Sequence, residues 1–144
     1  MKPFDGLIIA VDFDGTCVTH EYPQVGDDIG AADVLRDLVE KGARLILWTM
    51  RSGNQLDDAA GWFVKNSIPL FGVNDNPEQK SWTDSRKVYA HVYIDDAALG
   101  APLLTCAGAK RPYLDWVTTR RWLWSRFVPD AKPSSEALDT FLGR

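Results

Sequence analysis

The stretch LIIAVDFDGT, residues 7–16, decides the fold, because an apolar run leads directly into a cluster of acidic and small residues. The run at 7–11 is β-branched and has no polar face, which is typical of a strand buried on both sides of a parallel sheet. Asp12 and Asp14 follow it, and side chains two positions apart share one face of an extended chain. Gly15 suits a tight turn after the strand. The sequence therefore predicts a buried strand that ends in two carboxylates.

The rest of the chain alternates between strand and helix patterns. The run AADVLRDLVEKG at 31–42 places its apolar side chains on one helical face, and Gly42 suits a C-terminal cap. Ser52 and Gln55 have the spacing of a capping box for a second helix. Four apolar runs suit buried strands, at residues 7–11, 44–48, 68–73 and 92–94. This alternation predicts a three-layer α/β/α sandwich around a central, mostly parallel sheet with right-handed crossovers.

Composition limits the class of protein. The 144 residues are 45% hydrophobic and 25% charged, which is ordinary for one globular domain. A net charge of −4 argues against broad electrostatic binding of nucleic acid or of an anionic membrane. Cys17 and Cys106 have no metal-ligand spacing and suit a reducing compartment. We expect a soluble, cytoplasmic protein with a domain at 1–128 and an extension at 129–144 that is either packed on this domain or flexible.

Polar residues follow three of the predicted strands. The first strand ends at Asp12 and Asp14, and the other two are followed by the pairs Thr49 with Arg51 and Asp95 with Asp96. In an open parallel sheet the ligand site lies at the carboxyl ends of the strands. A carboxylate cluster suits a hard cation such as Mg²⁺, and the start of the helix after Thr49 would favour an anion. Carboxylates, Mg²⁺ and an anion pocket together indicate phosphoryl transfer.

These residues carry a resemblance to a known family. VDFDGT at 11–16 resembles the DxDGT signature of the haloacid dehalogenase-like hydrolase superfamily. Thr49 is similar to its second signature, Lys87 within SRK to its third, and Asp95–Asp96 within VYIDD to its acidic fourth. The resemblance covers about residues 7–100 and implies a Rossmann-like core with phosphatase activity.

The resemblance assigns roles to the acidic residues. Asp12 would be the nucleophile that forms an aspartyl-phosphate, and Asp14 the general acid and base. Mg²⁺ would be held by the carboxylate of Asp12, the backbone carbonyl of Asp14 and Asp95, with Asp96 as a second acidic contributor. These roles predict a magnesium-dependent phosphatase that hydrolyses phosphate monoesters.

The resemblance assigns phosphate binding to a different set of residues. Thr49 would donate a hydrogen bond to a phosphate oxygen, and Lys87 would pair with both the phosphate and Asp12. Arg51 is an additional phosphate contact in this interpretation, with a surface position as the equal alternative. For His20, in the loop THEYP, an exposed position is favoured over a contact with substrate.

The connections between the predicted elements are too short to hold a cap domain. The resemblance is therefore to the minimal, cap-less phosphatases, whose open site leaves a small metabolite, a nucleotide or a nucleic-acid end as the substrate. The alternative is a non-catalytic phosphate-binding or interaction module that keeps the fold. A Trp-rich helix at 113–127 is expected either to pack on the core or to contact another subunit, and nucleic-acid stacking is less favoured.

Overall fold

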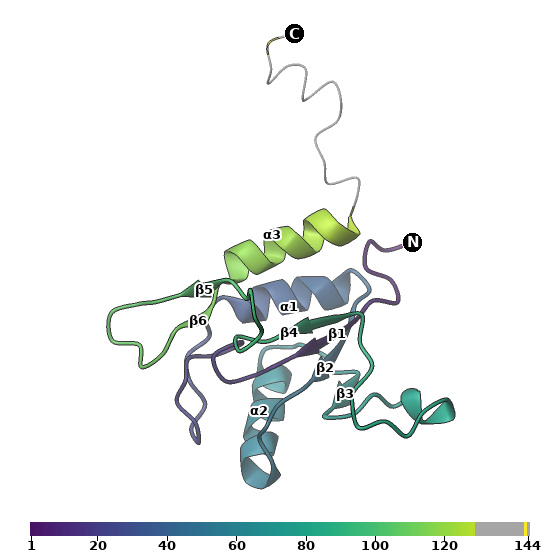
Figure 1. Ribbon diagram of the computed structural model, residues 1–144, viewed down its shortest axis with the longest axis horizontal. Helices are drawn as coiled ribbons and strands as arrows, with labels where there is room; N and C mark the ends of the chain where they lie inside the picture. Colours follow the sequence, from purple (N-terminus) through teal and green to yellow (C-terminus); the bar gives the residue numbers. More distant parts are fainter. Residues whose placement is uncertain (129–142, 144) are drawn as a thin grey trace.

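The computed structural model describes residues 1–128 and 143, and a four-stranded parallel sheet lies at its centre (Figure 1). The sheet order is β3-β2-β1-β4. The strands are β1 (Ile8–Val11), β2 (Arg44–Leu47), β3 (Gly72–Val73) and β4 (Val92–Ile94). All pairs in this sheet are parallel, so the carboxyl ends of β1, β2 and β4 meet at one edge. The parallel α/β architecture predicted from the sequence is confirmed.

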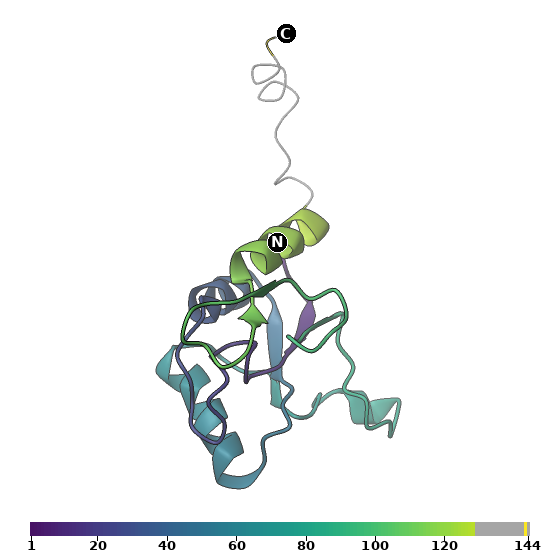
Figure 2. The same cartoon turned by 60° about the vertical axis from the view of Figure 1, so that its left-hand side comes forward.

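Three α-helices bury their apolar faces against the same side of the sheet (Figures 1 and 2). They are α1 (Ala31–Glu40), α2 (Gly53–Lys65) and α3 (Trp116–Phe127). The alternate β1 residues Ile9 and Val11 pack in one cluster with Leu38 of α1, Phe63 of α2 and Leu123 of α3. The two views show α1 and α3 side by side. The main core therefore lies between β1, β2 and these helices.

The opposite face of the sheet is covered differently. Ile8, Ala10 and Ile46 point to this side and pack against Val88 and Ala90 of the segment before β4. Within residues 1–128 no α-helix covers this face, and the segment between β3 and β4 holds only the short 3-10 helix η1 (Gln79–Ser81). The three-layer sandwich expected from the sequence is therefore not confirmed.

Buried amide side chains explain how this irregular segment satisfies its backbone. The side chain of Gln79 donates to the carbonyls of Ser85 and Lys87, at 3.0 and 2.9 Å, and accepts from the Tyr89 N–H at 2.8 Å. Asn76 donates to the Tyr89 carbonyl at 3.0 Å. These bonds pair backbone groups that a helix would otherwise pair internally.

Several local expectations differ from the structure. The strand expected at 68–73 is reduced to β3. Ser52 is the N-cap residue of α2, but its side chain makes no capping hydrogen bond, so the capping box is not formed. The helix expected from residue 113 begins at Trp116, where the Asp115 side chain accepts a hydrogen bond from the Thr118 N–H at 3.1 Å.

The residues before α3 form a hairpin instead, which the sequence analysis did not anticipate. β5 (Leu103–Leu104) pairs antiparallel with β6 (Tyr113–Leu114). Leu114 is buried in the main core, whereas Leu104 is exposed. The pattern was missed because the two strands are only two residues long.

The aromatic side chains of α3 divide between core and surface. Trp116 is buried, and the ring of Trp124 meets Phe4 edge-on at 4.9 Å between centroids, so core packing is confirmed for these residues. Val117 and Trp122 stay exposed, and a contact between subunits through them stays a prediction. Apart from residue 143, the extension predicted at 129–144 lies outside the described residues. In the part of the chain that the structure describes, no helix has the length and apolar character needed to cross a membrane.

Candidate functional site

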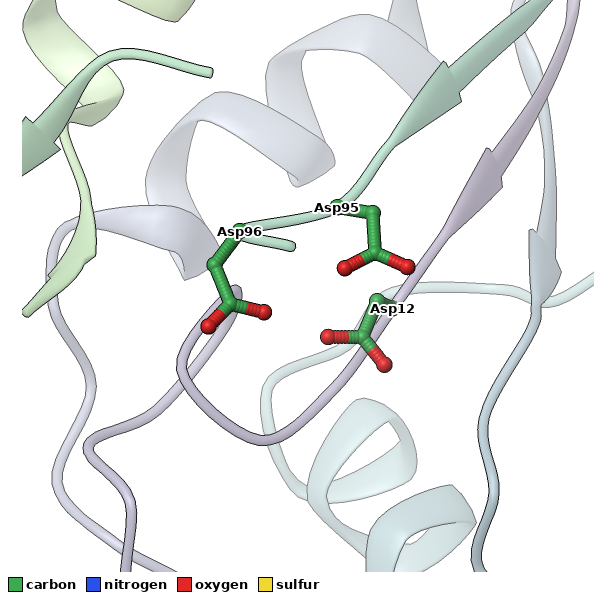
Figure 3. A group of neighbouring side chains, drawn as sticks. All are labelled: Asp12, Asp95 and Asp96. Atoms are coloured by element: carbon green, nitrogen blue, oxygen red, sulfur yellow. The ribbon is translucent and has the colours of Figure 1, made fainter. Parts of the chain in front are cut away.

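Three carboxyl groups converge where β1 and β4 end. Asp12 directly follows β1, and its N–H donates to the Ile94 carbonyl at 2.9 Å, which aligns the two strand ends. Asp95 and Asp96 directly follow β4. Figure 3 shows the three side chains turned toward one another, and one ligand atom of each lies within 4.8 Å of the others. The predicted meeting of Asp12, Asp95 and Asp96 is therefore present in the structure.

Thr16 forms hydrogen bonds with two of these acidic residues. Its hydroxyl lies 2.7 Å from Asp12 Oδ2 and 3.2 Å from Asp96 Oδ1, and it accepts the Asp96 N–H at 3.0 Å. Because a hydroxyl has a single hydrogen, the shorter distance favours donation to Asp12. Thr16 is fully buried, so this bond is shielded from water. The sequence placed this threonine with Asp12 and Asp14 at the end of the first strand but gave it no role of its own in the site.

His20 is a further residue of the site, for which the sequence favoured an exposed position over a contact with substrate. Its Nε2 lies 3.0 Å from Asp96 Oδ2, and its side chain is 12% exposed, so the expected exposed position is wrong. Gly15 makes room for this contact. It has φ +78°, and an added Cβ would lie 2.0 Å from His20 Nε2 and 2.6 Å from Asp96 Oδ2. Only the fold brings the His20 loop over this glycine, so no local signal could have identified it.

Asp14 and Arg51 form a bidentate ion pair. Arg51 Nε and Nη2 lie 2.8 and 2.7 Å from the two oxygens of Asp14. The Arg51 side chain is 1% exposed and also donates to the carbonyls of Pro23, Gln24 and Gln55. The hydrogen bonds to Asp14 raise the pKa of Arg51. Arg51 is thus occupied within the protein, which differs from both positions expected for it, a contact with phosphate and a surface position.

Thr49 and Lys87 have different positions relative to the acidic cluster. The Thr49 N–H donates to Asn74 Oδ1 at 2.8 Å, and its hydroxyl accepts the Arg51 N–H at 3.2 Å. Lys87 is exposed, and its ammonium lies 5.5 Å from the centroid of the Tyr93 ring. It lines a separate pocket beside η1. The structure therefore brings Thr49 to the site but does not bring Lys87 there.

An open cavity of about 470 Å³ joins these residues. Its wall includes the four aspartates, His20, Thr49 and Arg51. Four further residues at the wall were not predicted, namely Tyr22, Met50, Ala97 and Arg111. Tyr22 and Met50 are exposed apolar side chains, and Met50 follows Thr49 directly in the sequence. The cavity therefore combines an acidic floor with an apolar rim and one arginine from the β5–β6 hairpin.

The acidic cluster has the chemistry of a Mg²⁺ site. Burial, together with the smaller effect of the Asp95 charge, raises the pKa of Asp12 to about 7, although the Thr16 hydrogen bond acts to lower it. This pKa records the cost of placing neighbouring carboxylates in a partly dry site. Oxygen ligands are those that Mg²⁺ prefers, and a divalent cation would relieve the repulsion. The residues present therefore fit the ion.

The raised pKa of Asp12 predicts a pH-dependent stability in the metal-free protein. Asp12 ionises near 3.8 when unfolded but near 7 when folded, so the folded state holds its proton longer. Its contribution to stability is present below pH 3.8 and is lost as the pH rises through 7, by roughly 2–4 kcal/mol. Chemical denaturation with chelator between pH 5 and pH 8 measures this loss. Asp12→Asn should flatten the profile, and an unchanged profile in that variant would contradict the assignment.

Comparison with known proteins gives one informative match. The solved structure of a conserved protein from Bacteroides thetaiotaomicron is 32% identical to this chain and has a TM-score of 0.69. The match covers 85% of this chain and 93% of that chain. No protein-family model matches the sequence, and no curated protein matches it. The name of the Bacteroides protein states no activity, so the match shows a shared fold and family but no function.

Proposed function

We propose that this chain, which belongs to the same family as the conserved Bacteroides thetaiotaomicron protein, is a magnesium-dependent phosphatase. It would hydrolyse phosphate monoesters through an aspartyl-phosphate on Asp12, as a cap-less member of the haloacid dehalogenase-like superfamily. One observation carries the proposal. The Asp12 carboxyl group meets Asp95 and Asp96 at the end of a parallel sheet, on the floor of an open cavity.

The chain's own residues would hold the ion. The carboxylates of Asp12, Asp95 and Asp96 are the ligands, and the resemblance adds the backbone carbonyl of Asp14. When bound, Mg²⁺ supplies the positive charge that lets an anionic nucleophile approach an anionic phosphate. Thr16 and His20 orient two of the ligands through the hydrogen bonds described above. Such outer contacts tune a metal site strongly.

Asp12 would act as the nucleophile. Thr16 holds Oδ2, which leaves Oδ1 to attack phosphorus. A bond forms from Oδ1 to phosphorus while the ester P–O bond breaks, and the leaving alcohol takes a proton. Water then attacks the aspartyl-phosphate, which releases inorganic phosphate and restores the carboxylate. Thr49, at the cavity wall, is the candidate for a hydrogen bond to a phosphate oxygen.

Asp14 would transfer the protons in both steps. Arg51 occupies one lone pair on each Asp14 oxygen, so each oxygen keeps another that can carry the proton given to the leaving alkoxide in the first step and taken back from water in the second. In this role the ion pair fixes the direction of the carboxylate. The cavity position of Asp14 supports this assignment.

The same ion pair also favours a second candidate function. If Asp14 serves only to bind Arg51, the chain is a non-catalytic phosphate-binding or interaction module that retains the fold. The bidentate geometry and the burial of Arg51 are typical of a structural pair. The phosphatase and the binding module both need the acidic cluster, and they differ in whether a phosphate ester is cleaved.

Hydrolysis of a chromogenic aryl phosphate tests the proposal. We expect release of the alcohol with Mg²⁺ and loss of that release with chelator, restored by excess Mg²⁺. The assay then extends to sugar phosphates, nucleotides and 3′- or 5′-phosphorylated oligonucleotides, which identifies the substrate class. Folded protein that cleaves none of these esters with any divalent metal would overturn the phosphatase and favour the binding module.

A further inference from the structure

The cavity would keep a surplus of negative charge even with Mg²⁺ bound and Arg51 present. Four carboxylates line the cavity, and a phosphate monoester brings up to two more negative charges. Bound Mg²⁺ supplies two positive charges, and Arg51 is neutralised by Asp14. A substrate would therefore enter a site with surplus negative charge. Binding a phosphate needs a further positive side chain at the wall.

Arg111 is the side chain that meets this need. Arg51 and Arg111 are the arginines at the cavity wall, and the predicted cation Lys87 lines another pocket. The nitrogens of Arg51 are already bound to Asp14 and to three carbonyls. The ion pairs among residues 1–128 do not include Arg111. Its guanidinium is therefore available to a ligand.

The hairpin that carries Arg111 is attached to the site loop at two points. At its base, the Leu114 N–H donates to the Gly15 carbonyl at 2.9 Å, and Gly15 is the residue after Asp14. Near its tip, Lys110 Nζ lies 2.8 Å from Glu21 Oε2, beside His20. The hairpin and the loop after β1 both lie at the left of Figure 1, at the end of the sheet where β1 and β4 finish. These contacts hold Arg111 over the cavity.

We infer that the β5–β6 hairpin is a substrate-recognition element in which Arg111 binds the phosphate group, in the place predicted for Lys87. The inference rests on the proposed function, because it assigns a residue to the substrate of that same site. A guanidinium can form two parallel hydrogen bonds with phosphate, which a lysine cannot. The chain thus carries its recognition element after β4, and not as an insertion after β1 or β3.

Steady-state kinetics of Arg111→Ala with the aryl phosphate tests this inference. We expect KM to rise by about 10–100-fold, the value of a lost charged hydrogen bond, with kcat changed by less than about threefold. Arg111→Lys should recover part of the loss. Arg121→Ala, which removes an exposed arginine of α3 outside the cavity, is the matched control and should keep the parent KM. The thermal shift caused by Mg²⁺ should be the same in all four proteins.

Calorimetric binding of inorganic phosphate in the presence of Mg²⁺ separates this inference from the proposed function. If the parent cleaves no ester but Arg111→Ala weakens phosphate binding about tenfold, the inference holds and the phosphatase fails. If the parent turns over and Arg111→Ala keeps the parent KM and phosphate affinity, the inference is overturned. Lys87→Ala is measured in parallel. A rise of KM in that variant alone would show that Lys87, and not Arg111, binds the phosphate group.

Discussion

Replacement of Asp12 by Asn is expected to abolish phosphate release while the chain keeps its fold. The amide has nearly the shape of the carboxyl group and can still meet Thr16, but it cannot attack phosphorus. Loss of a covalent nucleophile typically lowers kcat by at least about 10³-fold. Removing one of three neighbouring carboxyl groups also relieves repulsion. The variant should therefore be inactive and, without metal at pH 8, more stable than the parent.

The measurement is turnover at saturating Mg²⁺ together with the unfolding midpoint. Asp57→Asn is the matched control, because Asp57 is an exposed aspartate of α2 outside the cavity. Mass spectrometry of acid-quenched reactions should find an added phosphoryl group on the parent peptide and none on Asp12→Asn. Near-normal turnover by this variant would reject Asp12 as the nucleophile.

Replacement of Asp14 by Asn is expected to lower both turnover and stability. Loss of general acid and base catalysis costs about 10²–10⁴-fold in kcat. Arg51 is buried and would keep one acceptor in place of a charged partner, which costs roughly 1–3 kcal/mol of unfolding free energy. Rates measured at a temperature where the variant is still folded report the loss of catalysis. Complete denaturation curves report the loss of stability.

Arg51→Gln is the companion of this experiment, because it breaks the same ion pair and leaves Asp14 in the cavity. A role of Arg51 in orienting Asp14 predicts reduced kcat in this variant with an unchanged Mg²⁺ requirement. If Asp14→Asn loses stability but keeps the parent rate, the ion pair is structural only. The acid and base assignment would then be wrong.

Patterns within short segments were enough to predict the sheet and the floor of the site. Alternating apolar runs and helical faces lead to a parallel sheet, because a strand buried on both sides has few other arrangements. The carboxyl ends of parallel strands share one edge, so Asp12 and Asp95 were predicted at the same edge of the sheet, and the pairing of β1 with β4 makes them neighbours there. The tight turn predicted at Gly15 is also present, because this residue has the positive φ that glycine adopts readily. These inferences needed only residues adjacent in sequence.

The covering of the second face depended on interactions that leave no periodic pattern. The polar segment before β4 is held by the buried side chains of Asn76 and Gln79, which replace the internal hydrogen bonds of a helix. A buried amide looks like an exposed one in a sequence. The expected third layer was therefore an extrapolation from the alternation of the other elements.

The walls of the cavity were settled by contacts between distant parts of the chain. His20 meets Asp96 across 76 positions, and Arg51 meets Asp14 across 37. Arg111 comes from a hairpin tied to the loop of Asp14. Such pairings depend on how loops close over the sheet, which no local spacing encodes. Thus the carboxylate that we propose as the nucleophile could be recognised from a ten-residue stretch, whereas its neighbouring charges were decided by the folded chain, because charge pairing acts through space and not along the sequence.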